Sequence, residues 1–337
     1  MGKPVKIAIN GLGRIGRTIL RQVLETPGGG GVEIVHLNDI AAPVLCAYLL
    51  KFDSVFGVMA RDVRAEGGCL LIDDLSIPFS HSPDLATVDL RGVDVLLECT
   101  GKAKTPDVAK RGLDRGARSV LVSGPSPAAD VTVVIGANDG ALGAARIVSN
   151  ASCTTNALAP LLRLVDDAWG LERAHMTTIH CYTGSQPTID APRGDFARSR
   201  AAALSMVPTT TSAERQLDLV VPDLAARISG AAVRVPTASV SAVDLVAQVR
   251  DAPDGDPVRA VHDLVAGSEV VGITDFPNVS SDLRGRPESL VIAASETRMI
   301  GQGQVRIFGW YDNEWGFSAR MLDMARRMAA RHDPMIC

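Results

Sequence analysis

The stretch that decides the fold is Val5–Arg17, VKIAINGLGRIGR. Val5–Asn10 is mainly apolar and predicts a buried strand, and an amphipathic segment follows the glycines. Gly11 allows a tight turn, Gly13 lets the backbone approach a pyrophosphate, and Gly16 lets the helix pack closely on the strand. Strand, glycine turn and helix in this order predict a dinucleotide-binding unit, with contacts to the cofactor from Gly11, Gly13, Arg14, Ile15 and Gly16.

A second apolar run, Val32–Leu37, ends at Asn38 and Asp39. An acidic residue about twenty residues past the glycines binds a ribose 2′-hydroxyl and repels a 2′-phosphate, so Asp39 favours NAD over NADP. The alternative is that Asp39 is only a helix N-cap or a turn residue.

The alternation of strands and helices continues to about residue 150. Thr100 and Ser123 follow two of the predicted strands, at the edge where an open parallel sheet binds its ligand. We therefore predict a doubly wound α/β domain over residues 1–151, with Thr100 and Ser123 in its cofactor site. The predicted elements are strands at Val93–Cys99, Ser119–Val122, Val131–Ile135 and Ile147–Val148, and a helix at 106–116.

A second informative stretch is Ser149–Asn156, SNASCTTN, which separates an apolar run from a predicted helix. Small polar residues are good N-caps, so we expect Cys153 at or near the helix N-terminus, where backbone N–H groups and the helix dipole favour a thiolate. A cysteine surrounded by hydroxyl and amide donors suits a covalent step on a carbonyl. The alternative is that Cys153 is a small buried hydrophobe.

The pattern changes after Cys153, because strands now follow one another with few helices between them. This predicts an α+β domain over residues 152–317 with a largely antiparallel or mixed sheet. Its loop at 181–212 is long enough to be functional or disordered. The predicted elements are helices at Leu161–Trp169, 257–266 and from Ser318 to about Arg331, and strands at Ala174–His180, Ala231–Val235, Ser239–Arg250, Leu290–Ser295 and Val305–Tyr311.

Composition limits the class of protein. The 337 residues carry a net charge of −4, which gives no electrostatic argument for a nucleic-acid or anionic membrane partner. The six cysteines form no CxxC pair and the first apolar run is too short for a secretion signal, so we expect no disulfide, no metal site and a cytoplasmic location. No apolar run approaches the length of a membrane span.

Four motifs together resemble the glyceraldehyde-3-phosphate dehydrogenase family, in order and over essentially the whole chain. They are residues 8–17, 149–156, Arg234–Thr237 (RVPT) and Trp310–Gly316 (WYDNEWG). The resemblance implies oxidation of D-glyceraldehyde 3-phosphate by NAD, with inorganic phosphate, to 1,3-bisphosphoglycerate. It also implies a Rossmann domain of residues 1–151 completed by a C-terminal helix at 318–337, a catalytic domain of residues 152–317, and usually a homotetramer.

The resemblance assigns roles at the motif positions. Cys153 is similar to the nucleophile that forms a thiohemiacetal and then a thioester, His180 to the base, and Asn313 to the residue that holds the nicotinamide carboxamide. An imidazole beside the thiol would lower the thiol pKa and accept the proton. The alternative for His180 is a histidine satisfied at a strand end.

The resemblance also implies two anion sites, and arginine forks and hydroxyls are the usual phosphate donors. For the phosphate of the substrate the similar residues are Thr183 and Arg234, with Arg200. A solvated loop charge is the alternative for Arg200, and it is a stronger alternative for Arg198. For the attacking phosphate the similar residues are Ser152, Thr154 and Thr211.

The chain departs from the usual family pattern near these sites. Ser212 replaces a glycine and would either donate a hydrogen bond to the attacking phosphate or crowd it, and residues 214–216 (ERQ) replace a small, lysine-containing run. Ala157 replaces a frequent second cysteine, and Ala191 resembles NADP-using relatives and predicts some NADP use. We hypothesise a secondary isozyme that resists electrophilic inhibitors of the catalytic cysteine, with neutral drift as the alternative.

Two other functions stay open. An erythrose-4-phosphate dehydrogenase resembles this chain but releases its acid to water, and Thr183, which suits a triose-phosphate site, argues against it. A non-catalytic binding protein on the same scaffold is the second alternative. The presence of Cys153, His180 and Asn313 argues against that one.

Overall fold

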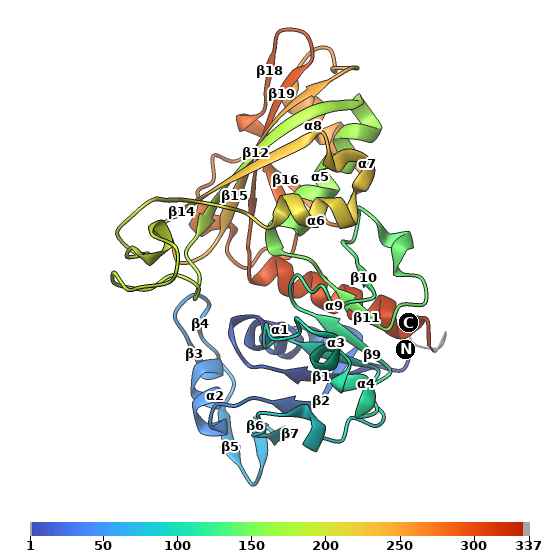
Figure 1. Ribbon diagram of the computed structural model, residues 1–337, viewed down its shortest axis with the longest axis vertical. Coiled ribbons are helices and arrows are strands. Elements are labelled where there is room, and N and C mark those ends of the chain that lie inside the picture. The colour runs from blue at the N-terminus through green and yellow to red at the C-terminus, as the bar shows by residue number, and fades with distance from the viewer. Residues whose placement is uncertain (1, 333–337) are drawn as a thin grey trace. The chain divides into compact units, whose positions relative to one another are not determined.

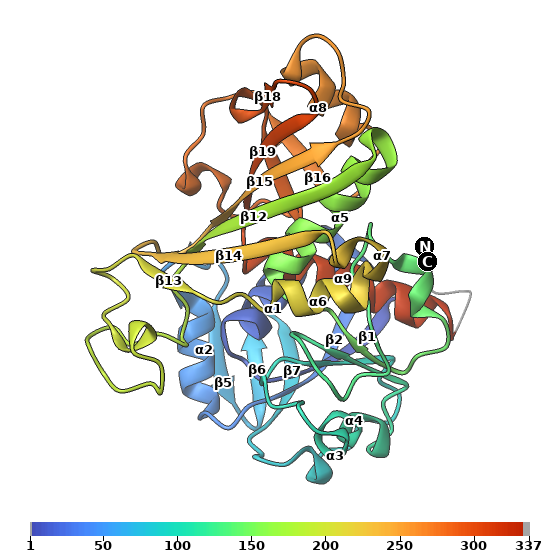
Figure 2. The same ribbon diagram turned by 45° about the horizontal axis from the view of Figure 1, so that its top comes forward.

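The computed structural model describes residues 2–332, which divide into two compact units. Unit 1 holds the chain up to Val133, Gly140–Ala151 and the segment from Ser318. Unit 2 holds Val134–Asp139 and Ser152–Phe317. Figures 1 and 2 follow the chain by colour from blue to red in two orientations.

Unit 1 is built on a nine-stranded sheet in the order β10-β11-β9-β8-β1-β2-β7-β6-β5. The pairs from β10 to β7 are parallel, whereas β6 and β5 add antiparallel strands at one edge. Because β1 pairs with β2 on one side and β8 on the other, the strand order reverses at β1, and the crevice at such a point binds ligands. The strands are β1 Val5–Asn10, β2 Val32–Asn38, β5 Val63–Glu66, β6 Cys69–Ile72, β7 Leu75–Ser80, β8 Val95–Glu98, β9 Ser119–Val122, β10 Val131–Thr132 and β11 Ile147–Ser149.

The helices of unit 1 include α1, whose apolar residues Ile19, Leu20 and Val23 recur at helical spacing and are buried. The C-terminal helix α9 joins the unit from Ser318 onward, and Arg326 in it donates to the carbonyl of Gly30 at 3.0 Å. The bounds are α1 Arg14–Glu25, α2 Pro43–Lys51, α3 Pro106–Ala109, α4 Arg111–Asp114 and α9 Trp315–Ala330, with a short pair β3 Phe52–Asp53 and β4 Gly57–Val58. These parallel strands and helices confirm the predicted doubly wound class.

Unit 2 carries an eight-stranded mixed sheet in the order β13-β14-β12-β15-β19-β17-β16, with β18 paired to β19. The pairs β12–β14 and β16–β17 are parallel and the others are antiparallel, which confirms the predicted mixed sheet. The strands are β12 Leu171–Cys181, β13 Val207–Thr209, β14 Ile228–Val235, β15 Ser241–Val249, β16 Val271–Thr274, β17 Leu290–Ala293, β18 Arg298–Ile300 and β19 Gln304–Tyr311. The helices are α5 Cys153–Trp169, α6 Ala213–Val220, α7 Pro222–Ala225 and α8 Pro257–Val265, and α5 packs on β12 and β15 (Figure 1).

The structure differs from the predicted elements mainly where elements are short. The helix predicted at 106–116 is two short helices that meet at Lys110, and the strand predicted at Val131–Ile135 ends at Thr132. The long loop at 181–212 contains the edge strand β13. A three-residue strand offers too few positions for an alternating pattern to be visible in the sequence. Among the described residues no helix is long and apolar enough to cross a membrane.

Candidate active site

One cavity in unit 2 brings together residues from α5, β12, β14 and the loop before α6. Its volume is about 270 Å³. Three arginines and six hydroxyl side chains line it, and the described lining residues include no carboxylate. Such a lining attracts anions, phosphates above all. The lining residues are Ser152, Cys153, Thr154, Thr178, His180, Arg198, Thr210, Thr211, Ser212, Arg215, Ala232 and Arg234.

The backbone before Cys153 explains why this side chain begins a helix. Ala151 is fully buried in the left-handed conformation, with φ of 54°, which turns the chain from β11 toward α5. Ser152 is the N-cap, and its Oγ accepts a hydrogen bond from the backbone N–H of Thr155 at 3.1 Å. Cys153 is the first residue of α5, which confirms its predicted place at a helix N-terminus.

The protonation of Cys153 differs from the prediction. Burial raises the pKa of the Cys153 thiol, and this effect outweighs the positive charge of Arg234 and the N–H groups of Thr154 and Cys153, which lower it. The net shift of the thiol pKa is therefore upward, opposite to the direction predicted from the helix N-terminus alone. The N–H groups at the start of α5 lower the pKa of the Cys153 thiol, as expected, but desolvation raises this pKa by more.

His180 lies near the end of β12, with Nε2 at 3.7 Å from Sγ of Cys153. Its Nδ1 lies 2.7 Å from the carbonyl oxygen of Cys181, which also accepts from Arg234 at 2.8 Å. Nδ1 also lies 3.0 Å from Nη1 of Arg234, so it donates to the carbonyl in one tautomer and accepts from the guanidinium in the other. Burial and then the charge of Arg234 lower the pKa of His180 to about 4, so the imidazole is neutral and has no positive charge with which to lower the thiol pKa as predicted.

Arg234 reaches His180 because β14 runs parallel to β12 with these two residues in register. Besides the Cys181 carbonyl, its guanidinium lies 3.4 Å from Oγ1 of Thr183. Thr183 in turn lies 2.9 Å from Oγ of Ser185. The predicted pair Thr183 and Arg234 is therefore in contact, beside the imidazole.

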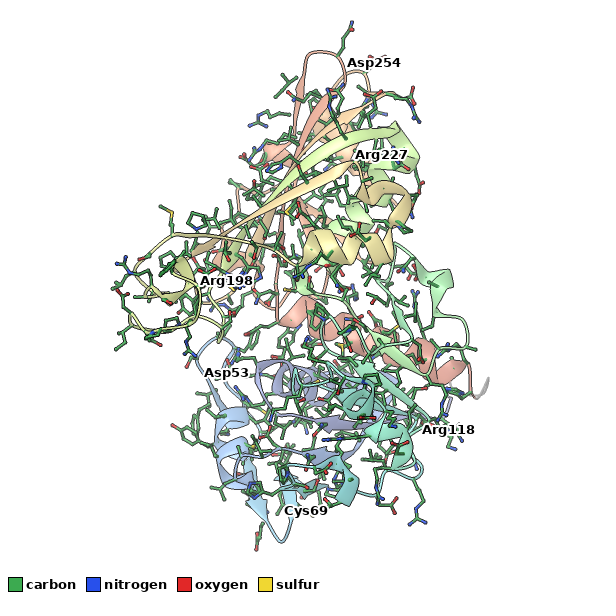
Figure 3. The ribbon with its side chains drawn as sticks, in the orientation of Figure 1. Asp53, Cys69, Arg118, Arg198, Arg227 and Asp254 are labelled. Atoms are coloured by element: carbon green, nitrogen blue, oxygen red, sulfur yellow. The ribbon has the colours of Figure 1, made fainter. Side chains whose placement is uncertain are left out.

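The loop arginine at the cavity is Arg198, not Arg200. Arg198, labelled in Figure 3, donates to Oγ1 of Thr209 at 2.5 Å and to the carbonyl of Thr210 at 3.0 Å, and it lines the cavity. Arg200 instead donates to Asp190 at 2.9 Å, and both side chains of this pair are more than half exposed. The structure therefore places Arg198 at the cavity, and Arg200, which was predicted there, is not among the lining residues. Two arginines two residues apart in an irregular loop cannot be distinguished by sequence spacing.

Asn313 is buried, and its Oδ1 accepts from Sγ of Cys181 at 3.1 Å and Oγ of Ser241 at 3.4 Å. With the amide oxygen held by two donors, the amide nitrogen is the group left to donate. The adjacent motif residue Tyr311 joins the site through Thr154 Oγ1 at 3.0 Å and Thr178 Oγ1 at 2.8 Å. Sequence reasoning missed Tyr311 and Thr178 as parts of the site, although Tyr311 lies within the WYDNEWG motif.

A second cavity, of about 280 Å³, lies in unit 1 at the carboxyl ends of β1, β2 and β8. Gly11, Gly13, Asp39 and Thr100 line it, as predicted for a cofactor site. The Asp39 carboxylate is held at the cavity, where Oδ1 accepts from the backbone N–H of Ala41 at 2.7 Å. The other lining residues are Asn10, Asn38, Ile40, Ser82, Pro83, Leu85, Glu98, Cys99, Lys102, Val108 and Arg111.

The glycines make this cavity fit a dinucleotide. Gly11 has φ of +96°, and a Cβ there would lie 2.9 Å from the carbonyl carbon of Cys99. A Cβ on Gly16 would lie 2.0 Å from the carbonyl oxygen of Gly11, whereas one on Gly13 would meet no atom within 4 Å. Gly13 is also the N-cap of α1 and supplies no capping side chain, and a helix N-terminus is where a pyrophosphate binds in such a fold.

Four of the predicted cofactor residues, Arg14, Ile15, Gly16 and Ser123, are not among the residues that line this cavity. Oγ1 of Thr100 donates to Glu98, and the hydroxyl of Ser123 hydrogen-bonds the thiol of Cys99. Arg14 pairs with Asp53 and lies over the ring of Phe56, and Ile15 is half-buried in the first turn of α1. The buried carboxylate Glu98, which accepts from Asn10 at 2.6 Å, was missed by the sequence reasoning.

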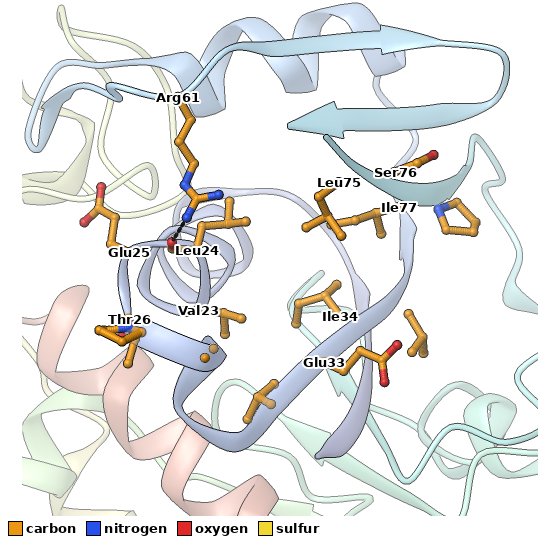
Figure 4. A pocket seen from close by; sticks show the side chains of 16 residues that line it. Val23, Leu24, Glu25, Thr26, Glu33, Ile34, Arg61, Leu75, Ser76 and Ile77 are labelled. Atoms are coloured by element: carbon orange, nitrogen blue, oxygen red, sulfur yellow. Dashed lines mark hydrogen bonds between the residues drawn. The ribbon is translucent and has the colours of Figure 1, made fainter. Parts of the chain in front are cut away.

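A larger cavity of unit 1, about 630 Å³, lies away from these motifs (Figure 4). It lies beside the C-terminal end of α1, and Arg61 donates there to the carbonyl of Leu24 at 2.8 Å. None of the predicted site residues lines it. Among the residues that the structure describes, no group of three or more His, Cys, Asp or Glu side chains is arranged to hold a metal ion.

Comparisons with known proteins agree with this geometry. Residues 5–106 match the family model for the glyceraldehyde 3-phosphate dehydrogenase NAD binding domain, and residues 152–313 match that for its C-terminal domain. The chain is 42% identical over 330 residues to a glyceraldehyde-3-phosphate dehydrogenase of Xanthobacter flavus, with 96% of this chain and 98% of that protein covered. It is 43% identical to one of Cereibacter sphaeroides, with the same coverage, and 39% identical to glyceraldehyde-3-phosphate dehydrogenase 1 of Bacillus subtilis, with 97% and 99% covered. The chain belongs to the glyceraldehyde-3-phosphate dehydrogenase family.

Proposed function

We propose that this protein oxidises D-glyceraldehyde 3-phosphate with NAD and inorganic phosphate to 1,3-bisphosphoglycerate. The observation that carries the proposal is the pair of Cys153 Sγ and His180 Nε2, 3.7 Å apart in a cavity lined by arginines and hydroxyls. A nucleophile with an adjacent base, in a site that binds phosphates, is what this reaction requires.

In the first step Sγ of Cys153 attacks the aldehyde carbon while its proton passes to Nε2 of His180. The imidazole then protonates the alkoxide oxygen, which gives a neutral thiohemiacetal. The N–H groups at the start of α5 stabilise the charge on that oxygen while it forms. In the tautomer that donates from Nδ1 to the Cys181 carbonyl, Nε2 is both acceptor and donor in these transfers.

In the second step His180 removes the hydroxyl proton again as the hydride leaves the carbon, and a thioester of Cys153 remains. NAD, when bound, supplies the hydride acceptor. An oxygen of inorganic phosphate then attacks the thioester carbonyl, the C–S bond breaks and the acyl phosphate leaves, and His180 returns its proton to the Cys153 sulfur, which restores the thiol and the neutral imidazole. A base with a pKa near 4 is deprotonated at neutral pH and is ready at each transfer.

The anion sites follow from the cavity lining. The substrate phosphate is bound by Arg198 and Arg234 with Thr183, on the side of His180. The attacking phosphate is bound by hydroxyl groups on the side of α5 and α6, those of Ser152, Thr154, Thr211 and Ser212.

We further propose that unit 1 binds the dinucleotide through Gly11, Gly13, Arg14, Ile15, Gly16, Asp39, Thr100 and Ser123. The Asp39 carboxylate suits a free ribose 2′-hydroxyl and therefore NAD. Because Ala191 resembles the residue of NADP-using relatives, we also propose some use of NADP. Asn313 is assigned to the nicotinamide carboxamide, because its amide nitrogen is the group free to donate to a carbonyl. This proposal includes the roles of the two domains. The cofactor domain is residues 1–151 with 318–337, and the catalytic domain is residues 152–317.

A homotetramer is also proposed. It is supported by large apolar side chains of the 181–212 loop that a single chain leaves in water, since Ile189, Phe196, Leu204 and Met206 are 74%, 99%, 82% and 73% exposed. The cytoplasmic location stays a prediction from the sequence.

The test is the formation of NADH from glyceraldehyde 3-phosphate, measured with and without inorganic phosphate and beside erythrose 4-phosphate. We expect turnover that depends strongly on phosphate and prefers the triose. Turnover without phosphate, or preference for the tetrose, would instead support erythrose-4-phosphate dehydrogenase. Binding of NAD without turnover of either aldehyde would support a non-catalytic protein.

The inhibitor-resistant isozyme is a second proposal, motivated by the position of Ser212 on the lining of the Cys153 cavity and by Ala157, which is fully buried in α5. A side chain at 212 narrows the approach of an electrophile to the thiol. We expect a thiol-directed epoxide to inactivate the protein more slowly than it inactivates a Ser212→Gly variant. Equal rates for the two proteins would exclude this role for Ser212.

A further inference from the structure

The cavity that contains Cys153 also contains a cation to which the mechanism above gives no role. Arg215 lies in the first turn of α6 and lines the cavity, as do Arg198 and Arg234. Because no described lining residue is a carboxylate, the three guanidinium charges are not neutralised within the cavity. The positive potential there is therefore balanced only when anions bind.

The three arginines differ in how the protein holds them. Arg198 is bonded to Thr209 and Thr210, and Arg234 to the Cys181 carbonyl and Thr183. Within residues 2–332 the exposed guanidinium of Arg215 has no hydrogen-bond or ion-pair partner.

The carboxylate next to Arg215 in the sequence, Glu214, has a partner of its own. Oε1 of Glu214 accepts from the backbone N–H of Gly230 on β14 at 2.5 Å. An arginine whose donors are unused, at the edge of an anion cavity, can direct its planar fork at two oxygens of one phosphate.

The residues next to Arg215 indicate which phosphate it serves. Ser212 is the residue before α6, yet its side chain makes no capping hydrogen bond, so its hydroxyl is free to donate into the cavity. Oγ1 of Thr211 accepts from the N–H of Ala213 at 3.1 Å, which leaves the Thr211 hydroxyl proton to donate as well. These two hydroxyls belong to the proposed site of the attacking phosphate, and Arg215 follows them in the first turn of α6.

We propose that Arg215 is a binding residue for the attacking inorganic phosphate and determines the affinity of the enzyme for that anion. The inference rests on the proposed function and adds a charge to a site otherwise formed by hydroxyls. A guanidinium fork matches the geometry of a tetrahedral dianion, whereas the lysine usual in this part of the family sequence would act as a point charge.

The experiment compares Arg215→Gln and Arg215→Lys with the native protein in steady-state assays in which phosphate and aldehyde are varied separately. We expect Arg215→Gln to raise the KM for phosphate about tenfold and that for the aldehyde by less than about twofold, because the lost contact is charge-assisted. Arg215→Lys keeps the positive charge but not the planar guanidinium fork, so we expect its KM for phosphate to rise by only about threefold. The matched control is Arg259→Gln, which removes the same charge from an exposed position on α8, outside the cavity.

An unchanged phosphate KM in Arg215→Gln, or an equal rise in Arg259→Gln, would overturn the inference. An equal rise of both substrate constants would also overturn it, since it would indicate a general field effect. A binding assay separates this outcome from failure of the proposed function, because bound phosphate should protect Cys153 from iodoacetamide whether or not the enzyme turns over. We expect the phosphate concentration for half protection to rise about tenfold in Arg215→Gln. The same concentration in both proteins would exclude an anion contact from Arg215.

Discussion

At the scale of single residues, burial disfavours the charged forms of both Cys153 and His180. Burial raises the pKa of Cys153 and lowers the pKa of His180, because desolvation disfavours the charged form of each group. Arg234 favours the thiolate and disfavours the imidazolium. We therefore expect the proton to move from the sulfur to the imidazole as the C–S bond forms.

The first prediction concerns the alkylation of Cys153. Its rate with iodoacetamide in the absence of phosphate should rise with pH through an inflection above 9.0, the ordinary thiol pKa, because burial raises the pKa of this thiol. The measurement is the second-order rate of loss of the Cys153 peptide thiol by mass spectrometry from pH 5 to 10.5. An inflection near pH 6 would show a thiolate–imidazolium pair and contradict the neutral assignment.

The second prediction concerns acid stability. The folded pKa of His180 is about 4, against 6.5 for the ordinary group, so the unfolded chain binds a proton that the folded chain does not between these values. Above pH 6.5, His180 therefore has no effect on the free energy of unfolding. As the pH falls from 6.5 toward 4, the free energy of unfolding decreases by up to about 3 kcal/mol.

Denaturant unfolding between pH 4 and 7 checks this sign. In His180→Gln, the free energy of unfolding should decrease less between pH 7 and 4 than it does in the native protein. His175→Gln is the control, because His175 lies exposed on the same strand β12. A steeper decline in His180→Gln would reverse the sign and contradict a lowered pKa.

The third prediction separates the two loop arginines. Arg198→Gln should raise the KM for the aldehyde phosphate about tenfold or more, because Arg198 lines the catalytic cavity. Arg200→Gln should change it by less than about twofold, because its partner is the exposed Asp190. Steady-state kinetics at saturating NAD make the comparison, and the reverse order of effects would restore Arg200 to the phosphate site.

At the scale of elements, the turn between β1 and α1 distinguishes a glycine needed for packing from one needed for the ligand. A methyl group on Gly16 would meet the Gly11 carbonyl oxygen at 2.0 Å, so the helix has to move away from the strand. A methyl group on Gly13 would meet no atom within 4 Å, and φ at Gly13 is an ordinary −67°. The same substitution should therefore have different effects at two positions three residues apart.

The fourth prediction follows from this contrast. Gly16→Ala should lower the free energy of unfolding by about 1–3 kcal/mol, as overpacking does. Gly13→Ala should change stability by less than about 0.5 kcal/mol, yet weaken NAD binding about a hundredfold, because its methyl group occupies the approach to the pyrophosphate. Denaturant titration and calorimetric NAD titration make the two measurements. Equal NAD affinity in Gly13→Ala and the native protein would contradict the position of the pyrophosphate.

At the scale of the whole molecule, the 181–212 loop should be part of a subunit interface. Phe196 and Leu204 are 99% and 82% exposed, which is unusual for large apolar side chains grouped in one segment. Sedimentation equilibrium should give a mass of about four times the 35.5 kDa of the chain. The double variant Phe196→Ser, Leu204→Ser should shift the mass toward smaller species, and a native protein that sediments as a monomer would contradict the tetramer.

The sequence by itself determined the class of both units and much of the chemistry. The glycine spacing of Gly11, Gly13 and Gly16 acts over one turn, and a helix N-cap at Ser152 acts over four residues, so local order is enough to predict both. The parallel domain, the mixed second sheet and the place of Cys153 on its helix all followed from such local patterns. Short elements such as β13 and the helices at 106–114 did not, because their ends depend on pairing with distant strands.

Only the tertiary structure decided which charges face the catalytic cavity and how its groups ionise. Arg198 and Arg200 are alike in sequence, and their roles differ because the folded loop places one against Thr209 and the other against Asp190. The pKa of Cys153 is raised, although its helix position alone favours a thiolate, because burial is a property of the packed surroundings. Backbone hydrogen bonding is short-ranged and visible in the order of residues, whereas desolvation and charge depend on everything that folding brings near.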